Sequence, residues 1–402
     1  MHLKSKKGVD IYHEFYLNLD IKNISAPEFA KVPVGTAAET SKWNKTVGDK
    51  VKKFDIIAYL KNDIPIYSTF SGTLTEIVSS PKIGEYTGMQ YAVIKTENDN
   101  IPSYPLWDDE EVLNKNSLLK ILKNGAVVDE VRKQYLFYTL SNDFDFGALV
   151  IDAFDDQPYN LSKTAAVLNY KDEVYLGAEI IAKAFNIKDI KLLINENFKT
   201  KAILKTMDNI EKITVGGKYP TKPVIQNYCA EKSALRIGAQ CCRAVFRAVY
   251  FREADLSRII TVWGDSIAEP SVARVPFGVP AENILKEFMA FGMIERVVSG
   301  GVMTGHVVSL NFPIYKWESS LTVMPLKKHH RTVECINCGR CAHVCPLGLA
   351  PYYLLRNSNF RGIQTAKELC AGVCDYCGAC AYICPARIPL VDIIKNYKEK
   401  GN

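Results

Sequence analysis

Apolar and polar positions alternate through short runs in the first quarter of the chain. The segment 31–95 contains three such runs, and Gly35, Gly48 and Gly72 mark turns within or between them. A period of two places every second side chain on one face, which is the pattern of a half-buried β-strand. We therefore expect a small β barrel or sandwich in this segment.

Domains that carry a lipoyl or biotinyl group on a lysine are built from similar phrases. The hairpin segment 68–72, STFSG, offers no lysine at its tip. A structural role for this unit is therefore favoured over that of a swinging arm.

The middle of the chain changes to the periodicity of an α/β unit. Residues 118–140 follow a helical pattern with one break at Gly125. Beyond it, 147–154 is typical of a buried strand, 172–185 of an amphipathic helix and 187–196 of a second strand. Strands that alternate with helices predict a parallel sheet.

A polar phrase follows the first strand of this unit: Asp155, Asp156, Gln157, Pro158 and Tyr159. Ligands of open α/β sheets bind beyond the carboxyl ends of the strands, so the phrase is a candidate binding segment. The alternative is that these acids only cap the next turn. The spacing alone does not separate the two.

Three cysteines lie in the same region. Cys241 and Cys242 belong to a helical stretch, and we expect them in the core. Cys229 lies in the turn-like phrase NYCAEK, so we expect it to be exposed, and it is a candidate redox thiol.

The segment 258–310 predicts strand, turn, strand and helix, and then a glycine-rich stretch that contains Gly300, Gly301 and Gly305. Such glycines allow the backbone to approach a neighbouring group closely, but ordinary turns need the same residues. We expect His306 to be part of the hydrogen-bonded structure rather than a ligand. KKHHR at 327–331 is either a solvated linker or a contact for an acidic partner, and we favour the linker.

Two cysteine runs dominate the C-terminal region, and each has the spacing C-x2-C-x2-C-x3-C-P. Three thiolates on a tight loop can reach three corners of one cubane, while the fourth cysteine points away and must bind the other cluster. We therefore predict two [4Fe–4S] clusters with crossed ligands. Cluster I takes Cys335, Cys338, Cys341 and Cys384, and cluster II takes Cys374, Cys377, Cys380 and Cys345.

Zinc sites are the alternative for these cysteines. Zinc ribbons use two C-x2-C pairs, without a third cysteine at the same spacing and a fourth before proline. Cys370, four residues before Cys374, has no place in the crossed scheme. We expect it to be a spare thiol near cluster II that could substitute as a ligand.

Composition narrows the class of protein further. The 402 residues suggest about three units, and 48% hydrophobic with 23% charged residues describes a globular protein. We see neither an apolar run long enough to span a membrane nor a secretory signal. Cysteine usage favours a reducing compartment. The net charge of +6 is scattered, so no nucleic-acid partner is predicted.

Taken together, the phrases resemble the C subunit of the Rnf electron-transport complex. The likeness rests on VGDKV with SGTL, RIITVWGD with VPFG, GGVMTG, CxxCGRCxxxCPxGLAP and CPARIPLVDIIK. It implies a multidomain α/β plus α+β protein. Its parts would be an unmodified lipoyl-like barrel-sandwich (1–98), an α/β domain like the flavoprotein of complex I (99–250), an SLBB-like β-grasp domain (251–325) and a two-cluster ferredoxin-like helical domain (326–402).

The chain departs from that family where the cofactors would bind. The family's G-x-G-G-A-G-F-P loop for FMN and NADH should follow Gly125, but this chain has AVVDEVRKQYLF there. The family's E-x-E-P-Y phrase is also altered, to residues 155–159. We therefore expect neither FMN nor NADH to bind in the usual way.

This combination is similar to soluble electron carriers of amino-acid-fermenting anaerobes, such as the electron-transfer protein associated with proline reductase. It implies a cytoplasmic carrier that relays electrons to a partner reductase, without inserting into a membrane. One alternative is an NADH-oxidising C subunit of an Rnf-type ferredoxin:NAD oxidoreductase complex, peripheral to the inner face of the membrane. The other is a non-catalytic docking subunit. Whether the chain is a carrier or an oxidoreductase subunit stays open.

Overall fold

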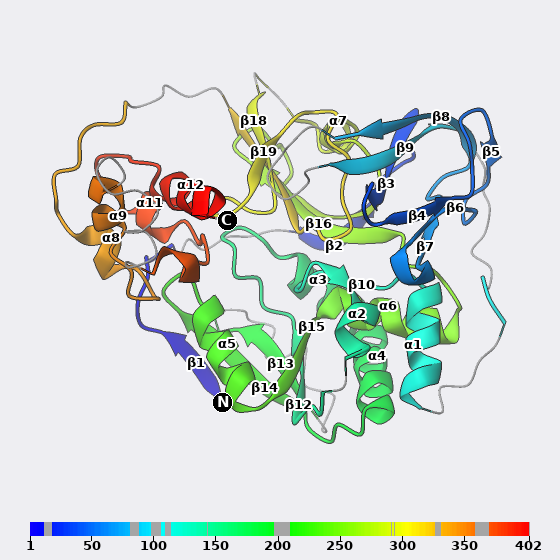
Figure 1. The fold of residues 1–402 in the computed structure, drawn as a ribbon, viewed down its shortest axis with the longest axis horizontal. Coiled ribbons are helices and arrows are strands. Elements are labelled where there is room, and N and C mark those ends of the chain that lie inside the picture. The colour runs from blue at the N-terminus through cyan, green and yellow to red at the C-terminus, as the bar shows by residue number, and fades with distance from the viewer. Residues whose placement is uncertain are drawn as a thin grey trace.

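The structure is a mixed α/β arrangement with several sheets, as the periodicity predicts (Figure 1). It is a computed structural model of the 402-residue chain. The residues that it describes are 1–11, 18–80, 88–97, 106–108, 114–142, 144–196, 210–290, 292, 294–325, 331–357 and 370–401.

A five-stranded sheet forms the centre of the α/β unit, and all its neighbouring strands are parallel. Its order is β1 (His2–Ser5), β14 (Glu211–Gly217), β13 (Ile190–Asn195), β12 (Ala148–Asp152) and β15 (Ala234–Gly238). Every residue of β12 is buried, because a central parallel strand has helices over both faces. The two strands predicted for this unit are confirmed.

Helices cover both faces of this sheet. On one face Leu149 and Ile151 of β12 join a core with α1 (Lys115–Asn124), α4 (Lys171–Ala184) and α6 (Ala239–Tyr250). On the other face Val150 packs with α5 (Lys222–Glu231). Helix α3 (Ser162–Asn169) contacts α4 and α6. A Cβ at Gly177 of α4 would lie 1.8 Å from the carbonyl oxygen of Cys242, so only glycine permits this close helix packing.

The segment after α1 differs from the prediction. The chain forms a hairpin of β10 (Val128–Asp129) and β11 (Gln134–Tyr135), and then the short helix α2 (Leu136–Leu140). The prediction of a helical 118–140 broken only at Gly125 is therefore wrong over the hairpin. The carboxylates of Asp129 and Glu130 accept hydrogen bonds from the start of α6, and these tertiary bonds override the local helical pattern.

Two small sheets form what we call the two-sheet β unit, which confirms the β-strands expected between residues 31 and 95. One sheet has the order β3 (Phe29–Thr36), β9 (Met89–Thr96), β8 (Gly72–Ser79) and β5 (Lys50–Val51). The other has the order β4 (Thr40–Trp43), β6 (Ile56–Leu60) and β7 (Pro65–Tyr67). Their inward side chains form one core, which includes Val34, Ile57 and Ile94.

A six-stranded mixed sheet lies beside the two-sheet β unit, with α7 (Ala281–Glu287) packed into its core. Its order is β19 (His306–Val308), β18 (Ile294–Ser299), β20 (Ser320–Pro325), β16 (Ser257–Gly264), β17 (Ser271–Pro276) and β2 (Asn18–Asn23). The predicted strands and helix of segment 258–310 are confirmed, and His306 lies in β19.

Strands β1 and β2 belong to two other sheets and not to the two-sheet β unit. His2 of β1 is opposite Thr214 of β14, and Asn18 of β2 is opposite Ser271 of β17. This pairing differs from the expected assignment of residues 1–98 to one unit. Both strands are short and polar, so their own sequence gives little indication of where they pair.

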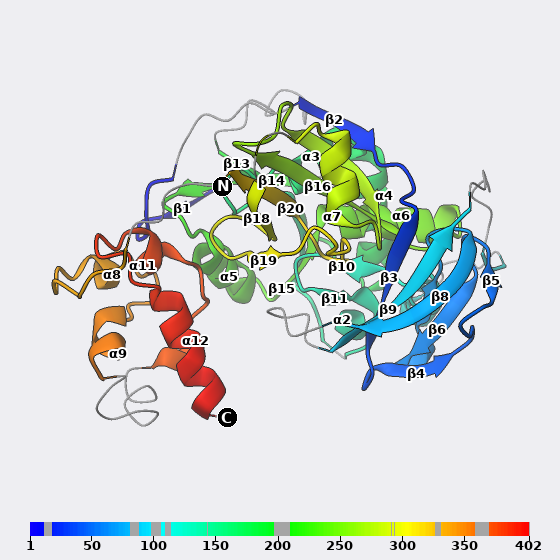
Figure 2. The same cartoon turned by 90° about the horizontal axis from the view of Figure 1, so that it is seen from above.

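The C-terminal part is a small helical body at the end of the molecule opposite the two-sheet β unit (Figure 2). It contains α8 (Arg340–His343), α9 (Pro351–Asn357), the 3-10 turn Ala371–Val373, α11 (Ala379–Tyr382) and α12 (Leu390–Gly401). The expected linker KKHHR falls at 327–331, and its first four residues lie outside the described residues. In the described part of the chain, no helix has the length and hydrophobicity needed to traverse a bilayer.

Candidate functional site

The eight cysteines of the two runs lie in two groups of four in the C-terminal body. One cavity is lined by Cys335, Cys338, Cys341 and Cys384. A second cavity is lined by Cys345, Cys374, Cys377 and Cys380. Each group therefore combines three cysteines of one run with the fourth cysteine of the other.

The local sequence explains how each run curls around its cavity. Gly339 and Gly378 occupy the same place in the two runs, and both adopt the left-handed conformation, with φ of 72° and 83°. Glycine tolerates this conformation best, so the loop can turn directly into α8 or α11. The short helix then carries the chain to Cys345 or Cys384, and the following proline ends the turn.

Burial disfavours ionisation of two thiols in the second group of cysteines. It raises the pKa of Cys377 to about 11 and that of Cys380 to about 12. Thiols with such values are protonated at neutral pH and become thiolates when a metal centre supplies positive charge. Among the described residues, no three His, Cys, Asp or Glu side chains converge closely enough to hold a single metal ion.

The two groups differ in their surroundings. Around the first group Cys338 is exposed and Ile336 is 65% exposed. The second group faces the α/β unit, where the Tyr219 hydroxyl donates to the Cys377 carbonyl oxygen at 2.7 Å. Val9 and Tyr219 also share a small apolar core with Ala379. The first group is thus the outer one and the second the inner one.

The polar phrase that follows β12 helps to hold the inner group. The Gln157 side-chain amide donates to the Tyr219 hydroxyl at 3.0 Å, and its oxygen accepts from the Met303 N–H at 3.3 Å. The backbone of Met303 lies against Gly378, where a Cβ would be 2.6 Å from the Met303 oxygen. Gln157, Tyr219 and the glycine-rich stretch therefore hold the loop that carries Cys377, and we call this set of contacts the docking seam.

A Tyr219→Phe substitution should test this seam. It removes one hydroxyl that both donates to Cys377 and accepts from Gln157, while the ring packing stays. We expect a loss of about 1 to 2 kcal/mol in the free energy of unfolding and faster hydrogen exchange at the Cys377 loop. Tyr250→Phe, at a 59% exposed position on α6, is the matched control and should change neither quantity. Equal exchange in both variants would contradict the role of the hydroxyl.

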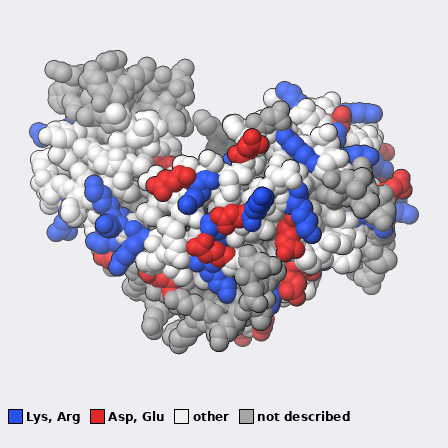
Figure 3. Space-filling view, turned by 90° about the horizontal axis from the view of Figure 1, so that it is seen from below, with Lys and Arg blue, Asp and Glu red and all other residues white. Residues whose placement is uncertain are grey.

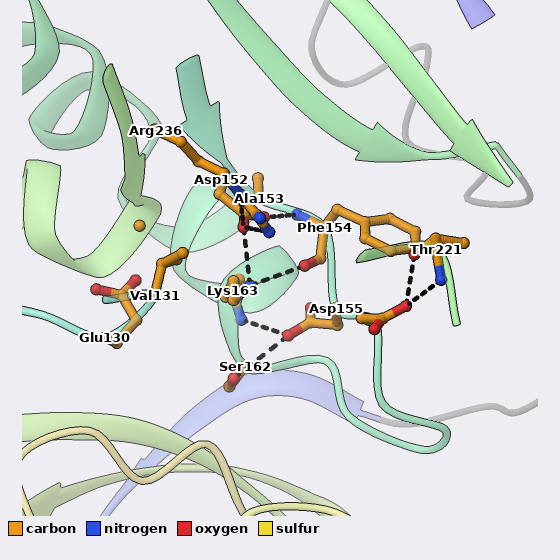
Figure 4. Close-up of polar contacts among 12 residues, drawn as sticks. Glu130, Val131, Asp152, Ala153, Phe154, Asp155, Ser162, Lys163, Thr221 and Arg236 are labelled. Carbon is orange, nitrogen blue, oxygen red and sulfur yellow. Dashed lines mark hydrogen bonds and ion pairs between the residues drawn. The ribbon is translucent and has the colours of Figure 1, made fainter. Parts of the chain in front are cut away.

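Two acids of the same phrase accept hydrogen bonds from the backbone near the starts of two helices. Asp155 accepts from the backbone N–H groups of Lys163 and Thr164 at 3.1 and 3.0 Å, at the start of α3. Asp156 accepts from the N–H of Thr221 at 3.0 Å, just before α5. The structure therefore supports the capping alternative for Asp155, which Figure 4 shows beside Ser162 and Lys163, whereas the partner of Asp156 lies 65 positions away.

A buried ion network lies at the carboxyl end of β12. Arg236 and Lys163 both reach the carboxylate of Asp152, and the Lys163 ammonium lies 3.2 Å from it (Figure 4). Burial raises the pKa of Asp152, but the two cations and the hydrogen bonds outweigh burial and hold it below its usual range. Charged side chains of the protein itself therefore occupy this end of the sheet.

The hairpin that replaces the expected helix adds another carboxylate at this end of the sheet. Glu130 accepts from the N–H groups of Gln240 at 2.9 Å and Cys241 at 3.1 Å, in the first turn of α6. Burial raises the pKa of Glu130 to about 7, while the Arg258 guanidinium, 4.0 Å away, opposes that shift. A Cβ at Gly238 would lie 2.0 Å from the Glu130 carboxylate. The carboxylate therefore occupies the position where a helix N-terminus would receive an anion.

A buried lysine lies behind this hairpin. The Lys316 ammonium contacts the Tyr135 hydroxyl, and only 6% of the residue is exposed. Burial lowers its pKa to about 7, against about 10.4 in an unfolded chain. Between these values the native state binds one proton fewer than the unfolded state, so stability should rise with pH.

The Lys316→Met variant should remove that dependence. For the unmodified chain we expect the free energy of unfolding to gain about 2 to 3 kcal/mol from this group between pH 7.5 and 9.5. Urea titrations at several pH values would measure it, with Lys286→Met, at an exposed position of α7, as the control. If Lys316→Met keeps the slope of the parent, the lysine is not the group responsible.

The other singled-out cysteines are placed as follows. Cys241 and Cys242 are fully buried, which confirms their prediction as core residues. Cys229 lies within α5 and is partly buried, and burial raises the pKa of its thiol. The prediction of an exposed turn is therefore wrong, because the phrase NYCAEK ends a helix. Cys370 is exposed and has a left-handed backbone.

Charges of both signs are mixed on one face of the molecule. Lysine and arginine are interspersed with aspartate and glutamate over the middle of the face seen in Figure 3.

Sequence reasoning did not identify Glu130, Tyr219 or Lys316. Two adjacent acids inside an otherwise apolar stretch, Asp129 and Glu130, were the available signal for the first. A single tyrosine or lysine carries no such signal, because its role depends on residues distant in the sequence.

Comparison with known proteins identifies relatives, although no family model matches the chain. The C subunit of the ion-translocating oxidoreductase complex of Buchnera aphidicola subsp. Baizongia pistaciae is 24% identical over 243 residues, which are 54% of this chain and 48% of that protein. The C subunit of the proton-translocating ferredoxin:NAD(+) oxidoreductase complex of Clostridium ljungdahlii is 27% identical over 343 residues, 76% of this chain and 73% of that protein.

A further C subunit, from the ion-translocating oxidoreductase complex of Rhodobacter capsulatus, is 25% identical over 238 residues, 52% of this chain and 45% of that protein. The chain thus spans about half the length of two of these three relatives and nearly three quarters of the Clostridium protein. The predicted resemblance to C subunits of the Rnf type is confirmed.

Solved structures give a weaker likeness. A chain of an NAD+-reducing [NiFe]-hydrogenase in the H2-reduced state has a TM-score of 0.49 and 12% identity, and the match covers 75% of this chain and 64% of that one. For the air-oxidised state the TM-score is 0.45 and the identity 10%.

Proposed function

We propose that this chain is an electron-transfer protein that holds two [4Fe–4S] clusters and relays electrons to a partner reductase in anaerobic metabolism. The observation that carries the proposal is the grouping of eight cysteines into two sets of four, each around its own cavity and each with one cysteine exchanged between the runs. Proline reductase is the partner that the sequence resemblance suggests.

The donor set fits such clusters. Cluster I would be held by Cys335, Cys338, Cys341 and Cys384, and cluster II by Cys345, Cys374, Cys377 and Cys380. A bound cluster supplies reversible one-electron chemistry at low potential. The protein's part is to exclude water and to aim backbone N–H groups at the sulfurs.

The difference between the two groups suggests a direction for partner contact. The outer group has exposed Cys338 and Ile336 beside it, while the inner group is packed against the α/β unit through Tyr219. Because electron transfer needs a close approach, we expect the partner to meet the cluster I end.

We also propose that FMN and NADH do not bind at the α/β unit. A flavin phosphate would need free N–H groups and a close backbone at a helix N-terminus. At α6 these N–H groups already donate to Glu130, and the carboxylate lies against Gly238. A phosphate placed there would meet a buried carboxylate, and like charges repel strongly in such surroundings.

Domain assignments follow the same resemblance. We assign the two-sheet β unit to a barrel-sandwich of the unmodified lipoyl-like type, the parallel sheet to a degenerate flavoprotein-like domain, the six-stranded sheet to an SLBB-like β-grasp domain and the C-terminal body to a ferredoxin-like domain. The strands β1 and β2 belong to the second and third of these.

The second candidate is an NADH-oxidising C subunit of a membrane-associated Rnf-type complex. The names of the relatives favour it, because they are subunits of ion-translocating oxidoreductase complexes. In that case the chain would lie in the cytoplasm at the inner face of the membrane, bound through partner subunits or a ferredoxin. A docking subunit without a redox role is the third candidate.

Anaerobic titration of the purified protein with NADH separates these candidates. For a carrier we expect no flavin in the protein, no bleaching of the iron–sulfur absorbance by NADH alone, and full bleaching by dithionite. The reason is that the Glu130 carboxylate occupies the position where the flavin phosphate would bind. Without a bound flavin, the chain has no acceptor for the hydride of NADH. Bleaching by NADH alone would restore the second candidate. Absence of iron and sulfide after anaerobic purification would leave only the docking role.

A further inference from the structure

We propose that a cavity between α6, β17 and the two-sheet β unit binds a small organic oxyanion, with phosphate or carboxylate groups, through Arg243 and Arg274. The cavity has a volume of about 980 Å³. Its lining includes none of the cluster cysteines and no residue of the phrase 155–159. The proposal is therefore separate from the electron-transfer role.

Three parts of the fold meet at this cavity. Arg243 and Arg247 project from α6, Arg274 comes from β17, and Phe54 and Phe70 come from the two-sheet β unit. Pockets of about 300 to 1,000 Å³ at the junction of domains are typical of small-molecule sites. The volume is sufficient for a ligand up to the size of a nucleotide.

One tyrosine organises two of the arginines. Tyr170, between α3 and α4, has the Arg243 guanidinium carbon 4.0 Å from its ring centroid and that of Arg274 at 5.0 Å. The Tyr170 hydroxyl also contacts an Nη2 nitrogen of Arg274. Two cations held beside one aromatic ring present a fixed pair of donor groups.

Carboxylates balance only part of this positive charge. Arg247 pairs with Glu253 at 2.7 Å, and Glu173 lies 3.0 Å from Arg243 and 3.4 Å from Arg247. Within the described part of the chain, Arg274 has no carboxylate within 4.0 Å, and its buried Nε has no hydrogen-bond partner. Two carboxylates thus face three guanidinium groups.

The remaining charges of the lining cancel one another. Arg258 pairs with Asp255 at 3.0 Å, and Lys53 and Glu97 add one charge of each sign. The excess positive charge therefore lies at Arg274. Burial, together with repulsion from Arg274 and Arg247, lowers the pKa of Arg243 to about 10. An oxyanion beside these groups would relieve that repulsion and accept paired N–H bonds from a guanidinium fork.

Apolar side chains provide room for the organic part of the ligand. Ile24, Phe54, Phe70 and Leu256 line the cavity with the arginines. Phe54 has a φ of 76°, a conformation that a phenylalanine rarely adopts. Strained residues of this kind persist where the surroundings fix them, and they gather at ligand sites.

The structural alternative is that Arg274 and Tyr170 only fasten the six-stranded sheet to the α/β unit. Both roles predict that an Arg274 substitution lowers stability. Only the binding role predicts that an anion stabilises the parent protein and that this effect depends on Arg274.

Calorimetric titration of the anaerobically purified, cluster-containing protein tests the proposal. Inorganic phosphate, AMP and citrate serve as probes at constant ionic strength, with chloride as the reference salt. We expect saturable binding of AMP or citrate with one site per chain, a raised unfolding temperature, and at least a tenfold weaker association in Arg274→Gln. Lys286→Gln, at an exposed position of α7, removes the same charge and should bind as the parent does.

The arms of the experiment separate the sources of the oxyanion. Preference for AMP indicates a phosphorylated ligand, and preference for citrate a carboxylate ligand. Saturable binding of phosphate alone would overturn the organic part of the proposal. No saturation by any probe, or equal affinity in the parent and Arg274→Gln, would overturn the site. If Arg274→Gln does not fold, Arg274→Lys keeps the charge but loses the fork, and should still weaken binding severalfold.

Discussion

Replacing Cys384 together with Cys374 is expected to remove both iron–sulfur clusters, whereas replacing Cys384 together with Cys335 removes only one. In the crossed arrangement Cys384 lines the same cavity as Cys335, while Cys374 lines the other. The first double Ala variant therefore loses a ligand from each cluster. We expect it to contain almost no iron, and the second to retain about four of about eight iron atoms per chain.

Iron and sulfide analysis and electron paramagnetic resonance of the reduced proteins measure this difference. Cys229→Ala, in α5 and away from both cavities, is the control and should keep the full complement. If the ligands are not crossed, the two double variants exchange their results, so either outcome identifies the connectivity. Full iron in both variants would contradict cluster ligation by these cysteines.

Removing the Glu130 carboxylate is expected to lower the free energy of unfolding by about 3 to 5 kcal/mol. In Glu130→Ala the first N–H groups of α6 lose their acceptor and the buried Arg258 loses one of its two nearby carboxylates. Both groups are shielded from water, so solvent cannot replace the lost partner.

Urea unfolding followed by circular dichroism measures the change. Glu282→Ala provides the control, because Glu282 makes only an exposed pair with Lys286 on α7 and should change stability by less than about 1 kcal/mol. A Glu130→Ala protein as stable as the Glu282→Ala control would show that the carboxylate does not hold the start of α6.

The sequence predicted those elements whose signal lies within the element itself. The buried run of β12 and the helical period of α4 and α6 depend on which faces are covered, and apolar spacing records this directly. The cysteine spacing was informative for the same reason, because it determines which cysteines a short loop can bring to one cluster.

The features that sequence reasoning missed depend on distant partners. The hairpin at β10 and β11 was taken as helix because its apolar residues fit a helical period, while the carboxylate contacts that bend it involve residues more than 100 positions away. The sheets that β1 and β2 join were not predicted, because their partner strands are also distant in the sequence. Gln157 and Tyr219 interact although they are 62 positions apart in the sequence, and neither residue type predicts such a contact.

The pairing of β1 with β14 has a consequence for synthesis on the ribosome. His2 and Thr214 are separated by 212 positions, so the first strand is made long before its neighbour exists. At about 5 to 20 residues per second the wait is roughly 10 to 40 s. During that time β1 must avoid other unpaired strand edges, such as those of the two-sheet β unit, which is completed earlier. Its polar sequence, HLKS, suits that delay, because it offers little apolar surface for premature association.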